Sequence, residues 1–341
     1  MVRIAGVMAH HADFLKTVLR TPLEISAWKE HRITVHNLRE AAILAEKEER
    51  EEISSSVQAW LGTNNRLEKD VNEMRQLRHE FPATTHWIIN HDTVQQWLSD
   101  NTRETSLLHI NGSLGIGKST SNSQFWLTFI GKSVLASRIV DECLSYPSSR
   151  TLFFYCHRED EKSRSAVAIL SSLIQQMIRY EPNLAYFLYR YEPYHGNELS
   201  NLQFLLEACM SISTRLYIII DGLDECTVDS QLAILKIFRE LLQHQRHNHE
   251  VEQYRFRFLF TSRNSFEISK ACVIEGLNPN TIQILPANTE ADISSYTTEW
   301  VSRIASRHGP FTNNVMQKLH TNVVSFSEGS FAFFIVQLKA Y

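Results

Sequence analysis

The sequence lacks the features of several special protein classes, so it is compatible with an ordinary globular protein. No segment approaches about eighteen consecutive apolar residues, so we expect no membrane span. The five cysteines form no C-x-x-C pair and are odd in number, which favours reduced, buried thiols and a cytoplasmic location. The net charge of −4 comes without a basic stripe interleaved with aromatic residues, so we expect protein partners or self-association and no nucleic acid. What is present, 341 residues with 43% hydrophobic residues, suffices for a sizeable core and about two domains.

A glycine-rich segment follows the apolar run at residues 107–110. Residues 112–119 fit the pattern G-x-x-x-x-G-K-[ST], in which backbone N–H groups bind the phosphates of a nucleotide. In such a loop Lys118 contacts the β- and γ-phosphates, and the hydroxyl of Ser119 is a ligand of Mg²⁺. We therefore predict a site for ATP or GTP with Mg²⁺; the alternative is a glycine-rich surface turn. Its expected residues are Gly112, Ser113, Leu114, Gly115, Ile116, Gly117, Lys118, Ser119 and Thr120.

A second motif follows about a hundred residues later. Residues 215–220 are nearly all apolar and rich in isoleucine, as in a strand that is buried on both faces, and Asp221-Gly-Leu-Asp224-Glu225 comes next. A carboxylate at the C-terminal end of a central parallel strand faces the ligand crevice. Asp221 is therefore expected to bind Mg²⁺, and Asp224 or Glu225 to orient the attacking water. Taken alone, these residues would indicate a turn.

A third run, residues 255–260, alternates as a strand does and ends in Thr261-Ser262-Arg263. An arginine at the carboxyl end of a strand can sense or stabilise a γ-phosphate, which makes Arg263 a candidate sensor. The alternative for Arg263 is a surface arginine that caps a loop.

Together these motifs resemble the NACHT group of STAND-class P-loop NTPases, especially its fungal, nephrocystin-like branch. The resemblance extends from about residue 87 to 296 and implies a signalling switch in which nucleotide exchange or slow hydrolysis controls assembly. Two alternatives stay open: a nucleotide-binding or protein-interaction module that does not hydrolyse, and a small-molecule kinase. The resemblance also rests on Trp87-Ile-Ile, Gln96-Trp97-Leu98, Asp141-Glu142-Cys143-Leu144, Asn288-Thr289, Asp292-Ile293 and Tyr296.

We expect three regions along the chain. Residues 1–80 would form a helical N-terminal region or linker, and residues 81–300 an α/β domain with a parallel five-stranded sheet flanked by helices. Residues 301–341 would begin a truncated helical region, because no repeat period follows. The expected strands are 107–110, 151–156, 216–220, 256–261 and 282–285, and the expected helices of the α/β domain include 165–179, 202–210 and 229–243. The polar stretch 244–250 contains three histidines, and we expect a solvated loop there in preference to a metal site.

The sequence Gly-Lys-Ser occurs twice, at residues 117–119 and 131–133. Trp126 stands five residues before the second copy, where the loop pattern requires glycine, so we assign the phosphate loop to the first copy. The sequence typical of the following helix, residues 134–144, begins only after the second copy. We therefore interpret residues 120–133 as an in-frame insertion, from a retained short intron or a duplication. We expect either an overlong helix or a short turn near Ser119 that is separated from the main helix at about Ser133.

Overall fold

The computed structural model describes residues 22–62, 66–80, 85–99, 106–112, 130–191, 198–210, 215–247 and 255–285, together with six isolated residues between 294 and 321. The chain divides into two units, residues 1–57 and 58–341, at a point inside helix α2 (Pro22–Leu61). The other helices are α3 (Arg66–Glu80), α4 (His86–Ile89), α5 (Asp92–Leu98), α6 (Ile130–Leu144), α7 (Ala166–Tyr180), α8 (Leu184–Tyr191), α9 (Leu199–Met210), α10 (Val228–His247) and α11 (Phe266–Ile274).

Helix α2 accounts for the long charged segment near the N-terminus. Its 40 residues carry ion pairs one turn apart, such as Lys47 with Glu51, which stabilise the solvated surface of a helix. The helix ends at Leu61, and Gly62 follows with a φ of 81°, a conformation that glycine adopts easily at a helix C-terminus. The predicted helical character of this region is confirmed, with a break that separates α2 from α3.

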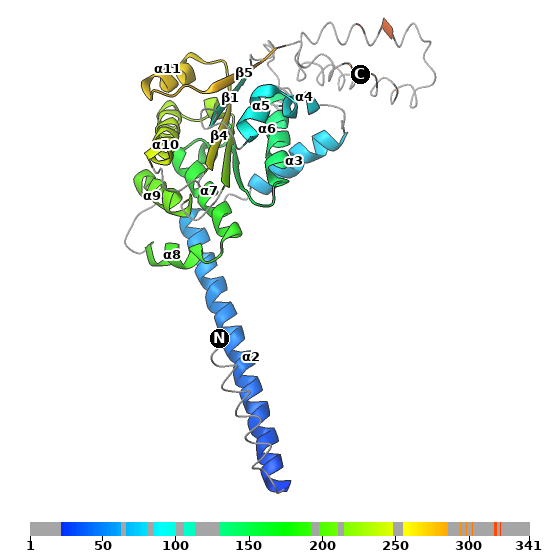
Figure 1. The fold of residues 1–341 in the computed structure, drawn as a ribbon, viewed down its shortest axis with the longest axis vertical. Helices are drawn as coiled ribbons and strands as arrows, with labels where there is room; N and C mark the ends of the chain where they lie inside the picture. The colour runs from blue at the N-terminus through cyan, green and yellow to red at the C-terminus, as the bar shows by residue number, and fades with distance from the viewer. Residues whose placement is uncertain are drawn as a thin grey trace. The chain divides into compact units, whose positions relative to one another are not determined.

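Five parallel strands form the sheet of the second unit (Figure 1). They are β1 (Leu107–Gly112), β2 (Arg150–Tyr155), β3 (Arg215–Asp221), β4 (Arg255–Arg263) and β5 (Asn280–Ile284). Their order in the sheet is β2-β3-β4-β1-β5, so the chain crosses from β1 to the edge strand β2, returns through β3 and β4, and adds β5 at the other edge. The five strands and the fold class predicted from the sequence are confirmed.

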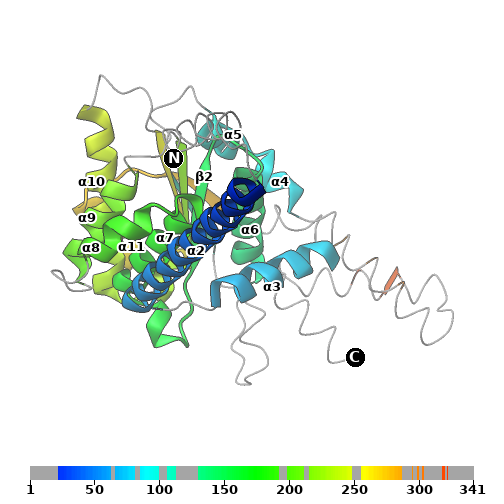
Figure 2. The ribbon, with the colours of Figure 1, turned by 90° about the horizontal axis from the view of Figure 1, so that it is seen from below.

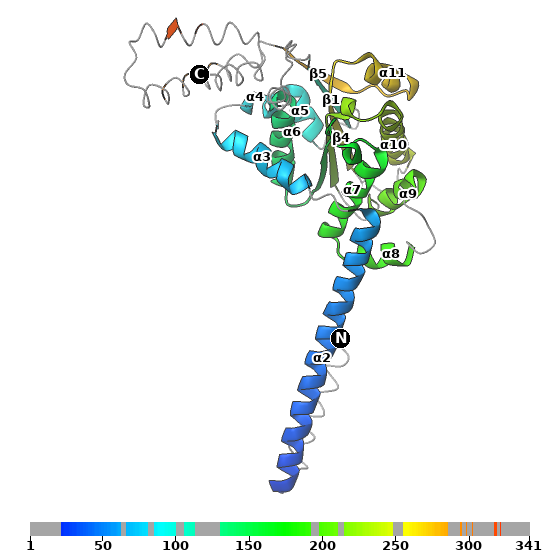
Figure 3. The same ribbon diagram turned by 180° about the vertical axis from the view of Figure 1, so that it is seen from behind.

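Helices cover both faces of this sheet, as Figures 1 and 3 show from opposite sides. Helices α3 to α6 lie on one face, and α7, α9, α10 and α11 lie on the other; the view from below in Figure 2 separates α3 and α6 from α9 and α10 in the same way. The interior strand β3 is buried from Leu216 to Asp221, which explains why its sequence is apolar at consecutive positions. Trp97, fully buried, donates its indole N–H to the carbonyl of Phe258 at 3.1 Å and thereby connects α5 to the sheet.

Two sequence-based boundaries can be compared with the structure. The domain boundary between residues 80 and 81 stays a prediction; in the structure, α3 packs against α6 through Arg75 and Arg78, which both bond to Asp141. The compact unit therefore begins before α3, and the Phe81-Pro82 sequence follows a helix that belongs to it. We predicted a loop over residues 244–250, but α10 continues to His247, because the stretch contains neither glycine nor proline to end a helix.

None of the described helices combines the length and the apolar character that a membrane crossing requires. All five cysteines are free and buried, as the sequence predicts.

Candidate functional site

The carboxyl ends of β1, β3 and β4 meet at one edge of the sheet, together with the start of α6. The pairing of β1 with β4 places Gly112 opposite Arg263, and that of β2 with β3 places Tyr155 opposite Asp221. In open α/β sheets this edge is where ligands bind.

Asp221, the last residue of β3, lies at this edge and is 3% exposed. Its Oδ2 atom accepts a hydrogen bond from the hydroxyl of Ser133 at 2.5 Å, and its Oδ1 atom accepts one from the hydroxyl of Thr261 at 2.6 Å. Burial raises the pKa of Asp221, while these two hydrogen bonds and the charge of Lys132 oppose the shift. A carboxylate beside a hydroxyl fits Mg²⁺ chemistry, because Mg²⁺ in nucleotide sites takes one or two protein ligands together with phosphates and waters.

Asp224 and Glu225 lie on the short turn Leu223–Glu225 that follows β3. Gly222 turns the chain here with a φ of 71°, and its N–H donates to the hydroxyl of Thr261 at 2.8 Å. Burial, followed by the charge of Asp224, raises the pKa of Glu225 to about 8. The turn therefore places two carboxylates beside Asp221, and the pKa of one of them, Glu225, is raised.

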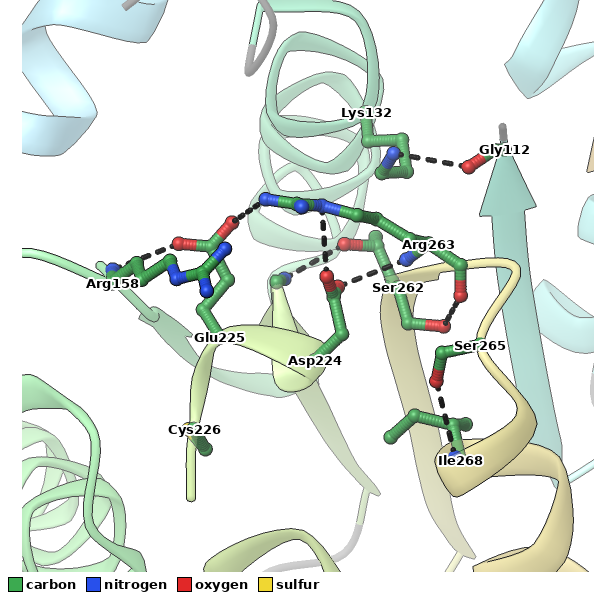
Figure 4. A network of polar contacts seen from close by, with 12 residues as sticks. Gly112, Lys132, Arg158, Asp224, Glu225, Cys226, Ser262, Arg263, Ser265 and Ile268 are labelled. Carbon is green, nitrogen blue, oxygen red and sulfur yellow. Dashed lines mark hydrogen bonds and ion pairs between the residues drawn. The ribbon is translucent and has the colours of Figure 1, made fainter. Parts of the chain in front are cut away.

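Arg263, the last residue of β4, joins these two carboxylates (Figure 4). Its backbone N–H donates to Oδ1 of Asp224 at 2.9 Å, and its Nε lies 3.1 Å from Oδ2 of the same residue. Its Nη2 lies 3.6 Å from Oε1 of Glu225, whose Oε2 accepts from the N–H of Arg158 at 2.9 Å. Both carboxylates are thus held by one arginine side chain.

Lys132, in the first turn of α6, faces the same edge. Its ammonium group donates to the carbonyl of Gly112 at 3.3 Å (Figure 4). Partial burial lowers the pKa of Lys132, and the nearby charges of Asp224 and Asp221 act in the opposite direction. The positively charged side chain of Lys132 is therefore held against the end of β1.

The structure brings four of the sequence-predicted site residues together: Asp221, Asp224, Glu225 and Arg263. Gly112 ends β1, where an added Cβ would lie 3.4 Å from the side chain of Ile284. Residues 113–120, including Lys118 and Ser119, lie outside the described residues, so their roles stay predictions.

Sequence reasoning gave no role to Lys132, Ser133 or Thr261. The repetition of Gly-Lys-Ser was the available signal for the first two, because the second copy stands directly before the predicted helix 134–144. No pattern in the sequence singles out Thr261 as the partner of Asp221; only the neighbouring positions of β3 and β4 reveal it.

A family model described as "Nephrocystin 3, N-terminal" matches residues 83–126 and 120–263, together just over half of the chain. The chain belongs to this family. The match confirms the predicted resemblance to nephrocystin-like NACHT domains, and with the α/β fold it supports a nucleotide-binding switch.

Individual relatives match less of the chain. The vegetative incompatibility protein HET-E-1 of Podospora anserina is 28% identical over 153 residues, which are 42% of this chain and 10% of HET-E-1. The chain thus spans about a tenth of that relative's length. Among solved structures, Aeropyrum pernix ORC2 in its ADPNP–ADP complexes gives a TM-score of 0.39 at 12% identity, over 72% of this chain and 67% of that chain. Drosophila ORC bound to poly(dA/dT) DNA and Cdc6 gives 0.31 at 7% identity, over 82% and 41% of the two chains.

Proposed function

We propose that this chain is a nucleotide-dependent signalling switch, which binds ATP or GTP with Mg²⁺ at the carboxyl edge of its sheet and hydrolyses the nucleotide slowly. The observation that carries the proposal is the convergence of Asp221, Asp224, Glu225 and Arg263 beyond the ends of β3 and β4, opposite the end of β1. Self-association or a protein partner would read the nucleotide state.

Each residue of this edge has a task in the proposed site. Asp221, with a neighbouring hydroxyl, would hold Mg²⁺, which neutralises negative charge between the β- and γ-phosphates when it is bound. Asp224 or Glu225 would orient the attacking water, and Arg263 would bind the γ-phosphate. The glycine-rich segment that begins at Gly112 would supply backbone N–H groups to the phosphates.

The pairing of Arg263 with Asp224 and Glu225 suggests how the nucleotide acts on the protein. A γ-phosphate competes for the same guanidinium group, so its binding would weaken the contacts of Arg263 with both carboxylates. Glu225 would then become available to water, and the turn after β3 would lose one of its links to β4. The presence of the γ-phosphate is thus converted into a change in the contacts between two strands.

Titration with a fluorescent ATP analogue, with and without Mg²⁺ and with unlabelled ATP and GTP as competitors, tests this proposal. We expect saturable, Mg²⁺-dependent binding that weakens roughly ten- to hundredfold in Asp221→Asn, because bonds to a charged group contribute about 1.5–3 kcal/mol. Asp229→Asn is the matched control, since Asp229 is exposed on α10. Absence of saturable binding by either nucleotide contradicts the proposal.

A second candidate function is a module that binds nucleotide or a protein without hydrolysis. The same ion pairs favour it, because Asp224 and Glu225 are both engaged by Arg263 and a water-orienting carboxylate must be free. Phosphate release measured alongside the titration separates the two: release above the level of Asp224→Asn supports the switch, and binding without release supports the module.

A further inference from the structure

The Gly-Lys-Ser copy at residues 131–133 lies where a phosphate loop needs its lysine and its hydroxyl. Ser133 donates to the buried carboxylate of Asp221 at 2.5 Å, which places a hydroxyl and the expected Mg²⁺ carboxylate side by side. Lys132 reaches the carbonyl of Gly112, the first glycine of the loop pattern, at 3.3 Å. Both side chains therefore point to the edge of the sheet where we propose that the phosphates bind.

The packing of α6 fixes this register. Leu135, Ala136 and Cys143 are each at most 3% exposed, and with Ile139 they turn the apolar side of α6 toward the protein interior. Leu135, Ile139 and Cys143 share a core cluster with Leu108 of β1. The helix cannot slide along the sheet without removing these side chains from the core.

Placing the first copy at this helix start would require a different set of core residues. If Ser119 took the position of Ser133, then Ser121 would replace Leu135 and Asn122 would replace Ala136, so that polar groups would enter the core without partners. Farther along the helix, Trp126 would replace Val140, which is 2% exposed, and would overfill the site. Burial thus favours the second copy at the helix that follows β1.

The sequence itself does not distinguish the two copies. Removal of residues 117–130 and removal of residues 120–133 give the same polypeptide, in which Gly112 to Ile116 continue into Gly-Lys-Ser-Val. The glycine absent before the second copy, where Trp126 stands, is therefore no obstacle, because the glycines can come from the start of the loop. The two segments of the family match, 83–126 and 120–263, each contain one copy.

We propose that Lys132 binds the β- and γ-phosphates of a nucleoside triphosphate and that Ser133 is the hydroxyl ligand of Mg²⁺, in place of Lys118 and Ser119. This inference rests on the proposed function and names the residues that perform two of its tasks. It reverses the sequence-based expectation that the first copy holds the phosphates.

Matched single variants of the full chain test the inference. In Mg²⁺-dependent titrations with a fluorescent ATP analogue, Lys132→Met should weaken binding at least about tenfold, because it removes charge-assisted bonds to phosphate. Lys118→Met should stay within about twofold of the wild type. Likewise, Ser133→Ala should reduce the effect of Mg²⁺ on nucleotide binding, whereas Ser119→Ala should leave that effect unchanged. Melting temperatures without nucleotide show whether the variants fold.

Labelling of the unmodified protein decides the question if Lys132→Met fails to fold. An ATP analogue with an aldehyde at the end of its polyphosphate forms an imine with a nearby lysine amine, releasing water, and borohydride reduction makes the product stable. Peptide mapping should then find the label at Lys132, with protection by excess ATP. A label at Lys118, or equal losses in the two lysine variants, would overturn the inference and leave the proposed function intact. Failure of the wild type to bind any nucleotide would contradict the proposed function itself, and this inference with it.

Discussion

The acidic and the basic side of the candidate site reach the edge of the sheet by different routes. On the acidic side, Asp221 ends β3 and Asp224 and Glu225 follow within four residues, so one short segment carries the expected metal ligand and the water-orienting carboxylates. On the basic side, Gly112 ends β1, but the lysine at its carbonyl is Lys132, 20 residues later on α6.

This difference shows what a motif determines by itself. A contiguous motif at the end of a buried strand places its side chains through the strand alone. A motif that spans a strand end and a helix start also depends on where the helix begins, and here two copies of Gly-Lys-Ser compete for that position. The packing of α6 then selects between them.

Within the acidic side, Asp224 and Glu225 should control hydrolysis without controlling affinity, which depends on Asp221. We expect Asp224→Asn or Glu225→Gln to lower phosphate release by about 10²- to 10⁴-fold, the usual contribution of a positioned acid or base. Binding of the fluorescent ATP analogue should stay within about twofold, because Asp221 remains. Glu267→Gln, exposed on α11, serves as the control. Unchanged phosphate release in both variants would remove the water-orienting role from this pair.

The strand of the basic side, β1, is also linked to β4 through His109 and Ser262, whose Nε2 and Oγ atoms lie 2.8 Å apart. Burial lowers the pKa of His109 from 6.5 to about 4, so the folded state holds it neutral while the unfolded chain takes up a proton below pH 6.5. The free energy of unfolding should therefore fall as the pH drops from about 6.5 to 4, by up to about 3 kcal/mol, and this contribution should be constant above that range.

Urea unfolding at several pH values measures this effect. The difference in unfolding free energy between the wild type and His109→Gln should change between pH 6.5 and 4, because glutamine does not titrate. A difference that is independent of pH would show that another group causes the acid sensitivity.

Removal of residues 117–130 tests how the length of the connection between Gly112 and the lysine affects the basic side of the site. It shortens the connection between Gly112 and the lysine by about two doublings in length, and since each doubling costs about 0.6 kcal/mol in loop closure, the free energy of unfolding should rise by about 1 kcal/mol. Nucleotide binding should not weaken, because the lysine and hydroxyl of the second copy remain. The protein should also become more soluble, because the deleted segment contains Phe125, Trp126 and Phe129. A variant that keeps the length but replaces residues 120–129 with glycine and serine separates length from sequence. Weaker binding or unfolding after the deletion would mean that the segment is an integral part of the domain.

The sequence therefore predicts the two sides of the site to different degrees. The apolar run of β3 and the alternation in β4 are local signals, so the strands and the positions of Asp221 and Arg263 follow from them. The role of Ser133 depends on its distance from Asp221, 88 residues later, and on core contacts of α6 that no local pattern reveals. The same limit applies to the packing of α3, because the ion pairs between α3 and α6 join segments more than sixty residues apart.

Those ion pairs give the smallest expected effect on stability, and they concern the basic side, because α6 carries Lys132. Arg75 and Arg78 of α3 both bond to Asp141 of α6, but the side chain of Arg78 is 12% exposed and that of Arg75 is 49% exposed. Burial by itself would raise the pKa of Asp141, yet the bonds from both arginines outweigh it and lower the pKa. Because exposed pairs are screened by water and salt, Arg75→Met should cost about 0–0.5 kcal/mol of unfolding free energy, and Arg78→Met about 1 kcal/mol.

Urea unfolding in low salt and in about 0.5 M salt, which screens surface charges, distinguishes the contributions of the two arginines to the unfolding free energy. The loss in Arg78→Met should persist in salt and the smaller loss in Arg75→Met should vanish. Arg78→Met should also weaken nucleotide binding slightly, because α3 supports the helix that carries Lys132, while the ratio of phosphate release to bound nucleotide stays constant. If phosphate release per bound nucleotide falls as well, the acidic side also depends on α3, and the two sides of the site do not act separately.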